Sequence, residues 1–307
     1  MTREKVVVVG VDGSEASHGA VDWAVAEAQR SGWRLHIVCA YALPSFTAAS
    51  LDGGYAAMDD TAIHQGAQTV VDEAVARTEN SGVEVTSALE TGDPAGVLVD
   101  LSREACLVVV GTRGGGGFTD RLLGTVSSAL PAHAHCPTVV VPLGSNRPFS
   151  PVRRVVVGVD GSESARIALR RAVDEAILWD AELSAVAAVP IATGAGAMAW
   201  LPAAVDREDV LADVREGLRV AVETAVGDRE ITVRQHALDG NAAALMAEFS
   251  TAVELVVVGS RGRGGFAGLL LGSTSQAVLH HAVCPVMVVP ARSADEGLSP
   301  TDVPWNR

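Results

Sequence analysis

The sequence predicts an α/β protein built from two copies of one domain, each with a parallel sheet covered by helices on both faces. The first observation is a repeat: the segment VVVVGVDGSE at 6–15 returns as RVVVGVDGSE at 154–163. The run LVVVG at 107–111 returns at 255–259, and Cys136-Pro137 returns as Cys284-Pro285, in each case 148 positions later. The second observation is that strands and helices alternate within each copy, which is typical of parallel sheets.

The chain length agrees with two domains. It has 307 residues, and one domain takes roughly 150. The segment 144–151 contains Gly, Ser and two prolines and is expected to be a short linker. The predicted divisions are domain 1 at 1–147, domain 2 at 148–292 and a polar tail at 293–307.

The first half of the copy opens with a continuous apolar run over 5–11, which predicts a buried strand. The turn Asp-Gly-Ser follows it. Ser14 is a good helix N-cap and Gly32 is a stop signal, so a helix is expected between them. A second apolar strand is predicted at 35–40, followed by a loop rich in Gly and Ser at 42–54.

The second half of the copy continues the alternation. Apolar residues at helical spacing predict a helix over 63–74, and 83–89 alternates as an edge strand does. A short helix, a strand, a helix and a strand are then expected at 94–101, 107–110, 126–133 and 138–141. Pro131 lies inside the last helix and is expected to shorten or kink it. Ligands of such sheets bind beyond the carboxyl ends of the strands, where strand order reverses.

Composition narrows the possible partners. Hydrophobic residues make up 48% and charged residues 20%, which is typical of a globular protein. The net charge of −14 argues against a nucleic-acid partner, and no apolar stretch is long enough to predict a membrane span. The four cysteines form no CxxC pair and read as core residues, so we expect a reducing cytoplasm.

A glycine-rich loop follows the fourth strand of each copy. It reads GTRGGGGFTDRLLGTVSS from Gly111 and GSRGRGGFAGLLLGSTS from Gly259, and both fit G-x2-G-x9-G-[ST]. Glycines allow a backbone to approach a ligand closely, and successive N–H groups form an anion-binding nest. The loop contains no lysine and follows the fourth strand, so it is neither a P-loop nor the dinucleotide fingerprint.

A helix is expected to start directly after each loop, at Thr125 and at Ser273. Its N–H groups and dipole would point at an anion. Hydroxyls at Thr125, Ser127, Ser273 and Ser275 are expected to donate to phosphate oxygens. The arginines of the loops either pair with phosphates or are solvated.

These motifs resemble those of the ATP-binding branch of the universal stress protein family, as two tandem domains of an actinobacterial type. The resemblance covers nearly the whole chain and implies a flavodoxin-like fold with strand order 3-2-1-4-5. It implies that Asp12 and Asp160 lie by the ribose and adenine, and that Ala40 and Ala188 line the adenine pocket through their backbone. It also implies pairing through the last strands, which would join Thr138–Val141 to Val286–Val289 and make the two copies an internal pseudo-dimer. A homodimer of two chains stays open as a further partner.

The candidate nucleotide-binding residues come from matching segments of the two copies. In the first copy they are Gly10, Asp12, Ala40, Gly111, Arg113, Gly114, Gly115, Gly116, Gly117, Arg121, Gly124, Thr125, Val126 and Ser127. In the second copy they are Gly158, Asp160, Ala188, Gly259, Arg261, Gly262, Arg263, Gly264, Gly265, Gly272, Ser273, Thr274 and Ser275. No catalytic residue or metal ligand is predicted.

Three functions remain open from the sequence. The first is a regulatory stress protein that holds ATP, with or without Mg²⁺, with little turnover and with regulatory protein partners that are unknown. The second is a slow ATP hydrolase or autokinase in which Asp12 and Asp160 help to place Mg²⁺. The third is a ligand-free module for dimerisation or partner binding.

Overall fold

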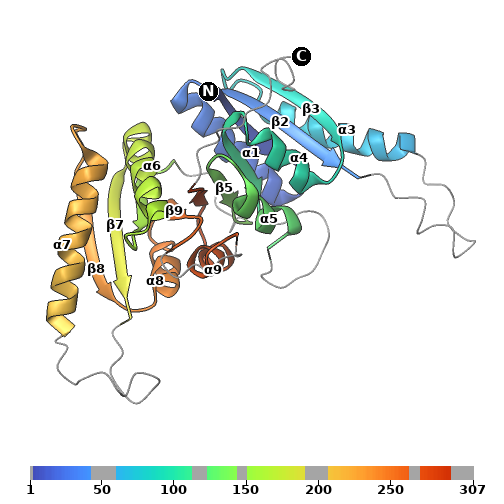
Figure 1. Cartoon of the computed structure of the whole chain (residues 1–307). Helices are drawn as coiled ribbons and strands as arrows, with labels where there is room; N and C mark the ends of the chain where they lie inside the picture. Colours follow the sequence, from blue (N-terminus) through green and yellow to red (C-terminus); the bar gives the residue numbers. More distant parts are fainter. Residues whose placement is uncertain are drawn as a thin grey trace, which may run out of the picture. The chain divides into compact units, whose positions relative to one another are not determined.

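The computed structural model describes residues 3–42, 60–112, 123–143, 151–190, 207–262 and 270–291. These residues form two compact units, and the division falls between residues 143 and 151 (Figure 1). In the described residues, no helix combines the length and the apolar character needed to cross a bilayer.

The first unit contains a parallel sheet with the order β3-β2-β1-β4-β5, which is the order that the resemblance implies. Its elements are β1 (Glu4–Gly10), α1 (Glu15–Ser31), β2 (Arg34–Tyr41), α3 (Asp60–Ala76), β3 (Val85–Thr91), α4 (Pro94–Leu101), β4 (Ala105–Gly111), α5 (Thr125–His133) and β5 (Thr138–Val141).

The second unit repeats this plan with the order β8-β7-β6-β9-β10. Its elements are β6 (Arg154–Gly158), α6 (Glu163–Trp179), β7 (Glu182–Val189), α7 (Arg207–Val226), β8 (Val233–Asp239), α8 (Ala242–Phe249), β9 (Leu255–Gly259), α9 (Ser273–His281) and β10 (Val286–Val289). The predicted α/β class is therefore confirmed in both halves of the chain.

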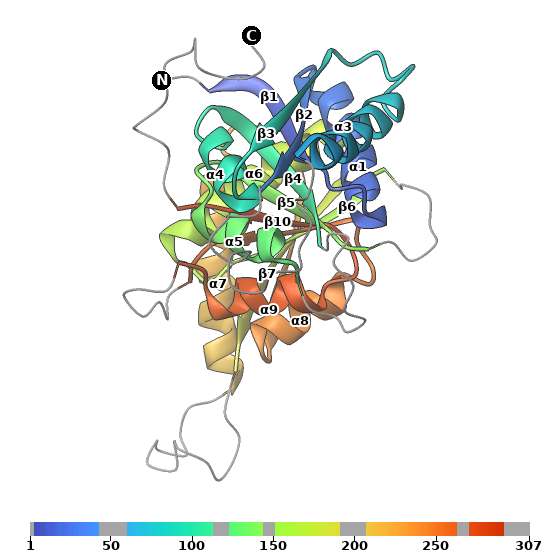
Figure 2. The same cartoon turned by 90° about the vertical axis from the view of Figure 1, so that its right-hand side faces the viewer.

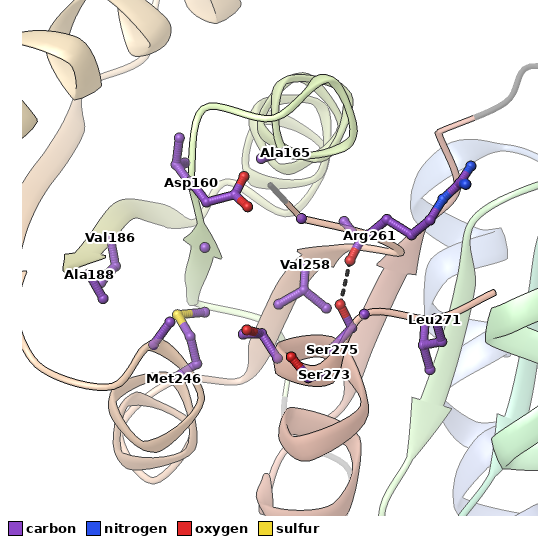
Figure 3. Close-up of a pocket in the computed structure, with 17 residues that line it drawn as sticks. Asp160, Ala165, Val186, Ala188, Met246, Val258, Arg261, Leu271, Ser273 and Ser275 are labelled. Carbon is purple, nitrogen blue, oxygen red and sulfur yellow. Dashed lines mark hydrogen bonds between the residues drawn. The ribbon is translucent and has the colours of Figure 1, made fainter. Parts of the chain in front are cut away.

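The helices of each unit cover both faces of its sheet. In the second unit α6 packs on β6 and β9 and contacts α7, while α8 contacts α9. Helices α8 and α9 lie side by side in two views at a right angle to each other (Figures 1 and 2). Figure 3 shows α6 on the side of the strand ends opposite α8 and α9. The first unit has the matching contacts, with α1 on β1 and β4 and α4 against α5.

Burial on both faces explains the apolar runs of the central strands. The side chains of Val6–Val9 in β1 and Val155–Val157 in β6 are almost completely buried. β-branched residues suit such strands because they pack well on a pleated surface covered on both sides. The polar residues that follow each run therefore come to lie at the carboxyl edge of the sheet.

Two local predictions are wrong in detail. The third strand occupies Val85–Thr91 rather than 83–89, because Val83 and Glu84 belong to the irregular segment that leads into it. Pro131 does not shorten its helix, since α5 and α9 both contain nine residues. Pro131 stands in the last turn, where its missing N–H removes one hydrogen bond and leaves the first turns intact.

Candidate functional site

Neighbouring strands bring the two sequence motifs of each copy to one edge of the sheet. β1 pairs with β4, and β6 pairs with β9, so the Asp-Gly-Ser turn and the glycine loop leave the sheet side by side. In the first unit the sheet continues from β1 to β2 on one side and from β4 to β5 on the other. In the second unit it continues in the same way from β6 to β7 and from β9 to β10. This is the point at which parallel sheets form ligand sites.

A cavity of about 450 Å³ lies at this edge in the second unit (Figure 3). That volume falls within the range of about 300–1,000 Å³ typical of small-molecule sites. Ten candidate residues line it: Gly158, Asp160, Ala188, Gly259, Arg261, Gly262, Gly272, Ser273, Thr274 and Ser275.

The sequence reasoning missed the apolar part of this cavity. Seven further residues line it: Val159, Ala165, Val186, Ala242, Met246, Val258 and Leu271. Most of them belong to apolar runs that read as core. Their positions could have identified them as residues of the site. Val186 and Val258 lie near the carboxyl ends of their strands, and Met246 lies on the buried side of α8.

The helices that start at the site lack side-chain caps. Elsewhere, Ser14, Asp93, Ser162 and Asn241 each accept a backbone N–H in the first turn of α1, α4, α6 and α8. Both α5 and α9 start after a glycine, Gly124 or Gly272, and no side chain accepts there. The first-turn N–H groups of an α-helix have no partner within the helix.

The uncapped turn of α9 borders the cavity. Its first helical hydrogen bond runs from Gln276 N to Gly272 O, and the three residues between them, Ser273–Ser275, line the cavity. Three first-turn N–H groups together with the positive end of a helix dipole suit an anion.

Two serine hydroxyls have a role different from the predicted one. Ser275 Oγ donates to Gly259 O at 2.6 Å, and Ser127 Oγ donates to Thr112 O at 2.8 Å. A serine hydroxyl has a single hydrogen, so in this structure neither side chain donates to a phosphate. Both serines instead tie the start of the helix to the end of the preceding strand.

Replacing Ser127 with alanine should lower the free energy of unfolding by about 1 kcal/mol, because a part-buried hydrogen bond is lost while Gly124 N still donates to Thr112 O. Denaturant unfolding of the full chain measures this. The control is Ser128→Ala, which removes an exposed hydroxyl that donates to Gly124 O and should cost less than about 0.5 kcal/mol. Equal losses in the two variants would contradict the tethering role.

The two aspartates hold the turns before α1 and α6. Asp160 Oδ1 accepts Ser162 N at 2.9 Å, and Asp12 Oδ1 accepts Ser14 N at 3.0 Å. Both side chains are exposed. A Cβ placed on Gly262 would lie 2.5 Å from Asp160 Oδ2, so this loop glycine passes directly over the carboxylate. In Figure 3 the Asp160 carboxylate points toward the cavity.

The glycines that end β4 and β9 have no room for a side chain. A Cβ on Gly111 would lie 2.6 Å from the carbonyl carbon of Ala16, and one on Gly259 would lie 2.4 Å from Ser164 Oγ. Ser164 Oγ also accepts Arg261 N at 3.3 Å. Glycine at these positions lets the loop leave the sheet in contact with the first turn of α1 or α6.

The first unit places its described candidates at the matching edge. Gly10 ends β1, Asp12 follows it, and Ala40 is the last residue but one of β2. The candidates from Gly124 to Ser127 lie at the start of α5. Some loop candidates lie outside the described residues: Arg113, Gly114, Gly115, Gly116, Gly117 and Arg121 in the first copy, and Arg263, Gly264 and Gly265 in the second. Across the described part of the chain, no three His, Cys, Asp or Glu side chains gather as a metal site would require.

The comparison with protein families decides the relationship. The model of the universal stress protein family matches residues 4–142 and again 151–290. The chain belongs to this family. It carries two tandem universal stress protein domains, as the repeat predicted.

Universal stress proteins of mycobacteria share this arrangement. The chain is 34% identical to universal stress protein Rv2623 of Mycobacterium tuberculosis over 301 residues, which covers 92% of this chain and 95% of that protein. It is 32% identical to Rv1996 of the same organism over 304 residues, covering 92% and 94%. A solved universal stress protein from Archaeoglobus fulgidus has the same fold, with a TM-score of 0.68 and 24% identity over 95% of this chain and 97% of that one.

Proposed function

We propose that each domain of this universal stress protein binds one molecule of ATP and holds it with little turnover, as a nucleotide-dependent regulator in the cytoplasm. The observation that carries the proposal is the uncapped first turn of α9, Ser273–Ser275, which opens onto the cavity. Because the chain is acidic overall, phosphate has to be held by local N–H groups and the helix dipole. The uncapped start of α5 would act in the same way in the first domain.

The apolar part of the cavity suits the nucleobase of a nucleotide. Apolar side chains of β7, α8 and β9 line it, including Val186, Met246 and Val258. Such a surface favours a planar heterocycle of low polarity, as adenine is. The exposed carboxylate of Asp160 is an acceptor suited to ribose hydroxyls. An apolar surface, an acceptor and an anion position in one cavity match the three parts of ATP.

The remaining candidates enter the proposal as the wall of the phosphate position. Gly259, Gly262 and Gly272 keep the loop backbone close to the ligand, and the loop arginines would lie near its outer phosphates. Any Mg²⁺ bound with ATP would be held mainly by phosphate oxygens and water, because Mg²⁺ usually keeps several waters and few protein ligands.

The geometry favours the holding of ATP over its hydrolysis. The described residues that line the cavity include one carboxylate, Asp160, and neither His nor Lys. Since Asp160 Oδ1 accepts Ser162 N, the carboxylate is oriented by its own turn, and general-base catalysis needs a group within reach of the attacking water. Steady turnover that disappears in the double variant Asp12→Ala, Asp160→Ala would replace our proposal with a slow hydrolase or autokinase.

The test is native mass spectrometry of the purified full chain, followed by calorimetric titration with ATP. We expect up to two adenine nucleotides per chain, and the same experiment reports whether chains form homodimers. A chain that carries no nucleotide and takes none up at millimolar ATP would instead favour a ligand-free module that works through protein partners.

A further inference from the structure

The apolar parts of the two sites differ at three positions. In the second unit this part is formed by Val159, Ala165, Val186, Ala188, Ala242, Met246, Val258 and Leu271. The residues at the same repeat positions in the first unit are Val11, Ser17, Val38, Ala40, Pro94, Leu98, Val110 and Leu123. Five of the eight pairs are identical, so within this lining a difference in base preference comes from Ala165 against Ser17, Ala242 against Pro94 or Met246 against Leu98.

Leu98 packs tightly over the end of the first strand. A Cβ placed on Gly10 would lie 2.8 Å from Leu98 Cδ1 and 3.3 Å from Val110 Cγ1. The buried Leu98 side chain thus occupies the space directly above Gly10. Its branch at Cγ leaves few ways to move without a clash, because interiors are close-packed.

Met246 leaves more room at the same place. A Cβ on Gly158 would lie 3.6 Å from Met246 Sδ and 3.7 Å from its Cε, which are ordinary contacts. Figure 3 shows the sulfur of Met246 on the cavity side of α8, near Ala188. Methionine is unbranched and has three rotatable bonds, so it adapts to a ligand, and its sulfur makes favourable contacts with aromatic rings.

We propose that Met246 and Leu98 determine the base specificity of the two sites: the second site accepts an enlarged adenine base that the first site excludes. This inference rests on the proposed binding of ATP in both domains. Met246 would contact the base directly, and the thioether would shift to admit an added methyl group. Leu98 would hold the first site at the size of unsubstituted adenine.

The experiment exchanges the two residues. Each site is studied alone, with ATP binding at the other site weakened by a glutamate at its helix start. Thr125→Glu blocks the first site and Ser273→Glu blocks the second. Calorimetry then compares ATP with its analogues methylated at C2 or at N6. We expect the second site to bind at least one analogue within about threefold of ATP, and the first site to lose about tenfold or more for both, since one methyl group in an apolar pocket gives about that discrimination.

The exchange should transfer this preference. Met246→Leu should make the second site reject the analogues, and Leu98→Met should make the first site accept one. Both swaps conserve volume and should leave the fold intact. The matched controls are the other two differences, Ala165→Ser and Ala242→Pro, the latter at the first position of α8 where proline is tolerated; both should leave the preference unchanged.

A second readout does not depend on affinity. In protein labelled with ¹³C at the methionine methyl groups, the Met246 signal, assigned by its loss in Met246→Leu, should shift on addition of ATP and stay in place with tripolyphosphate. If a control variant changes the preference between ATP and its analogues, the inference is overturned while ATP binding stands. The same holds if the two sites bind the analogues equally well. If the wild type binds no ATP, the proposed function fails and the inference fails with it.

Discussion

The variant Ser273→Glu should bind ATP at the second site about a hundredfold more weakly than the wild type. Ser273 is the first residue of α9, exposed at the cavity wall. A carboxylate there faces the proposed phosphate position. Two like charges about 4 Å apart near a protein surface repel by about 4 kcal/mol, and each 1.4 kcal/mol is about tenfold in affinity; screening by salt reduces the effect somewhat.

The same variant should not lose stability. A glutamate in the first turn interacts favourably with the helix dipole by about 0.3–1 kcal/mol, so the thermal unfolding midpoint should stay the same or rise. The control Ser273→Gln introduces a neutral side chain of nearly the same shape as glutamate. It should bind ATP within about threefold of the wild type. Thr125→Glu and Thr125→Gln form the matched pair in the first domain, because Thr125 starts α5.

Calorimetric titration of each variant with ATP provides the measurement. The double variant Thr125→Glu, Ser273→Glu should show no binding while it remains folded. If Ser273→Glu and Ser273→Gln bind ATP equally well, the helix start is not where the phosphates lie, and the proposed function loses its main support.

The sequence predicted the parts of the structure that depend on local pattern. The runs at Val6–Val9 and Val155–Val157 gave the central strands because burial on both faces requires continuous apolar residues. The caps at Ser14 and Ser162 gave the helix starts. The repeat gave the two family domains directly, because a duplication preserves both pattern and spacing.

The sequence could not give contacts between distant segments. Met246 was not among the candidate residues, and only the packing of α8 on β6 and β7 places it in the cavity. The hydroxyl of Ser275 looked like a phosphate donor, but the distance to Gly259 O decides that it donates to the backbone. Pro131 looked disruptive, but it stands in the last turn, where the one hydrogen bond that it removes leaves the earlier turns of α5 intact. Each of these outcomes depends on three-dimensional position, which spacing alone does not encode.

The first domain should lose stability in mild acid because of one buried histidine. His36 in β2 is completely buried, and its Nδ1 lies 2.8 Å from Thr86 Oγ1 in β3. Burial, with a smaller contribution from the charge of Arg34, lowers the pKa of His36 from 6.5 to about 4. Between these two values the unfolded chain takes up a proton that the folded domain does not.

This difference in proton binding makes the folded domain less stable as the pH falls. The contribution of His36 to stability is complete above pH 6.5 and is lost progressively as the pH falls toward about 4. The total loss is about 3 kcal/mol, since each unit of pKa difference corresponds to about 1.36 kcal/mol. His36→Gln keeps a polar side chain beside Thr86 and does not titrate, so the variant should lose about 2–3 kcal/mol less than the wild type between pH 7 and pH 4.5.

The second domain supplies an internal control, because Ser184 in β7 takes the place of His36 at the same repeat position. Hydrogen exchange of backbone amides in β2 and β7, followed from pH 7 to pH 4.5 after correction for intrinsic exchange rates, separates the two domains. Protection of β2 should fall faster with acid in the wild type than in His36→Gln, and β7 should not distinguish the two proteins. Carboxylates that titrate in the same range affect both proteins equally, so their contribution cancels in the comparison. An unchanged pH dependence of β2 in His36→Gln would show that His36 is protonated as readily in the folded domain as in the unfolded chain.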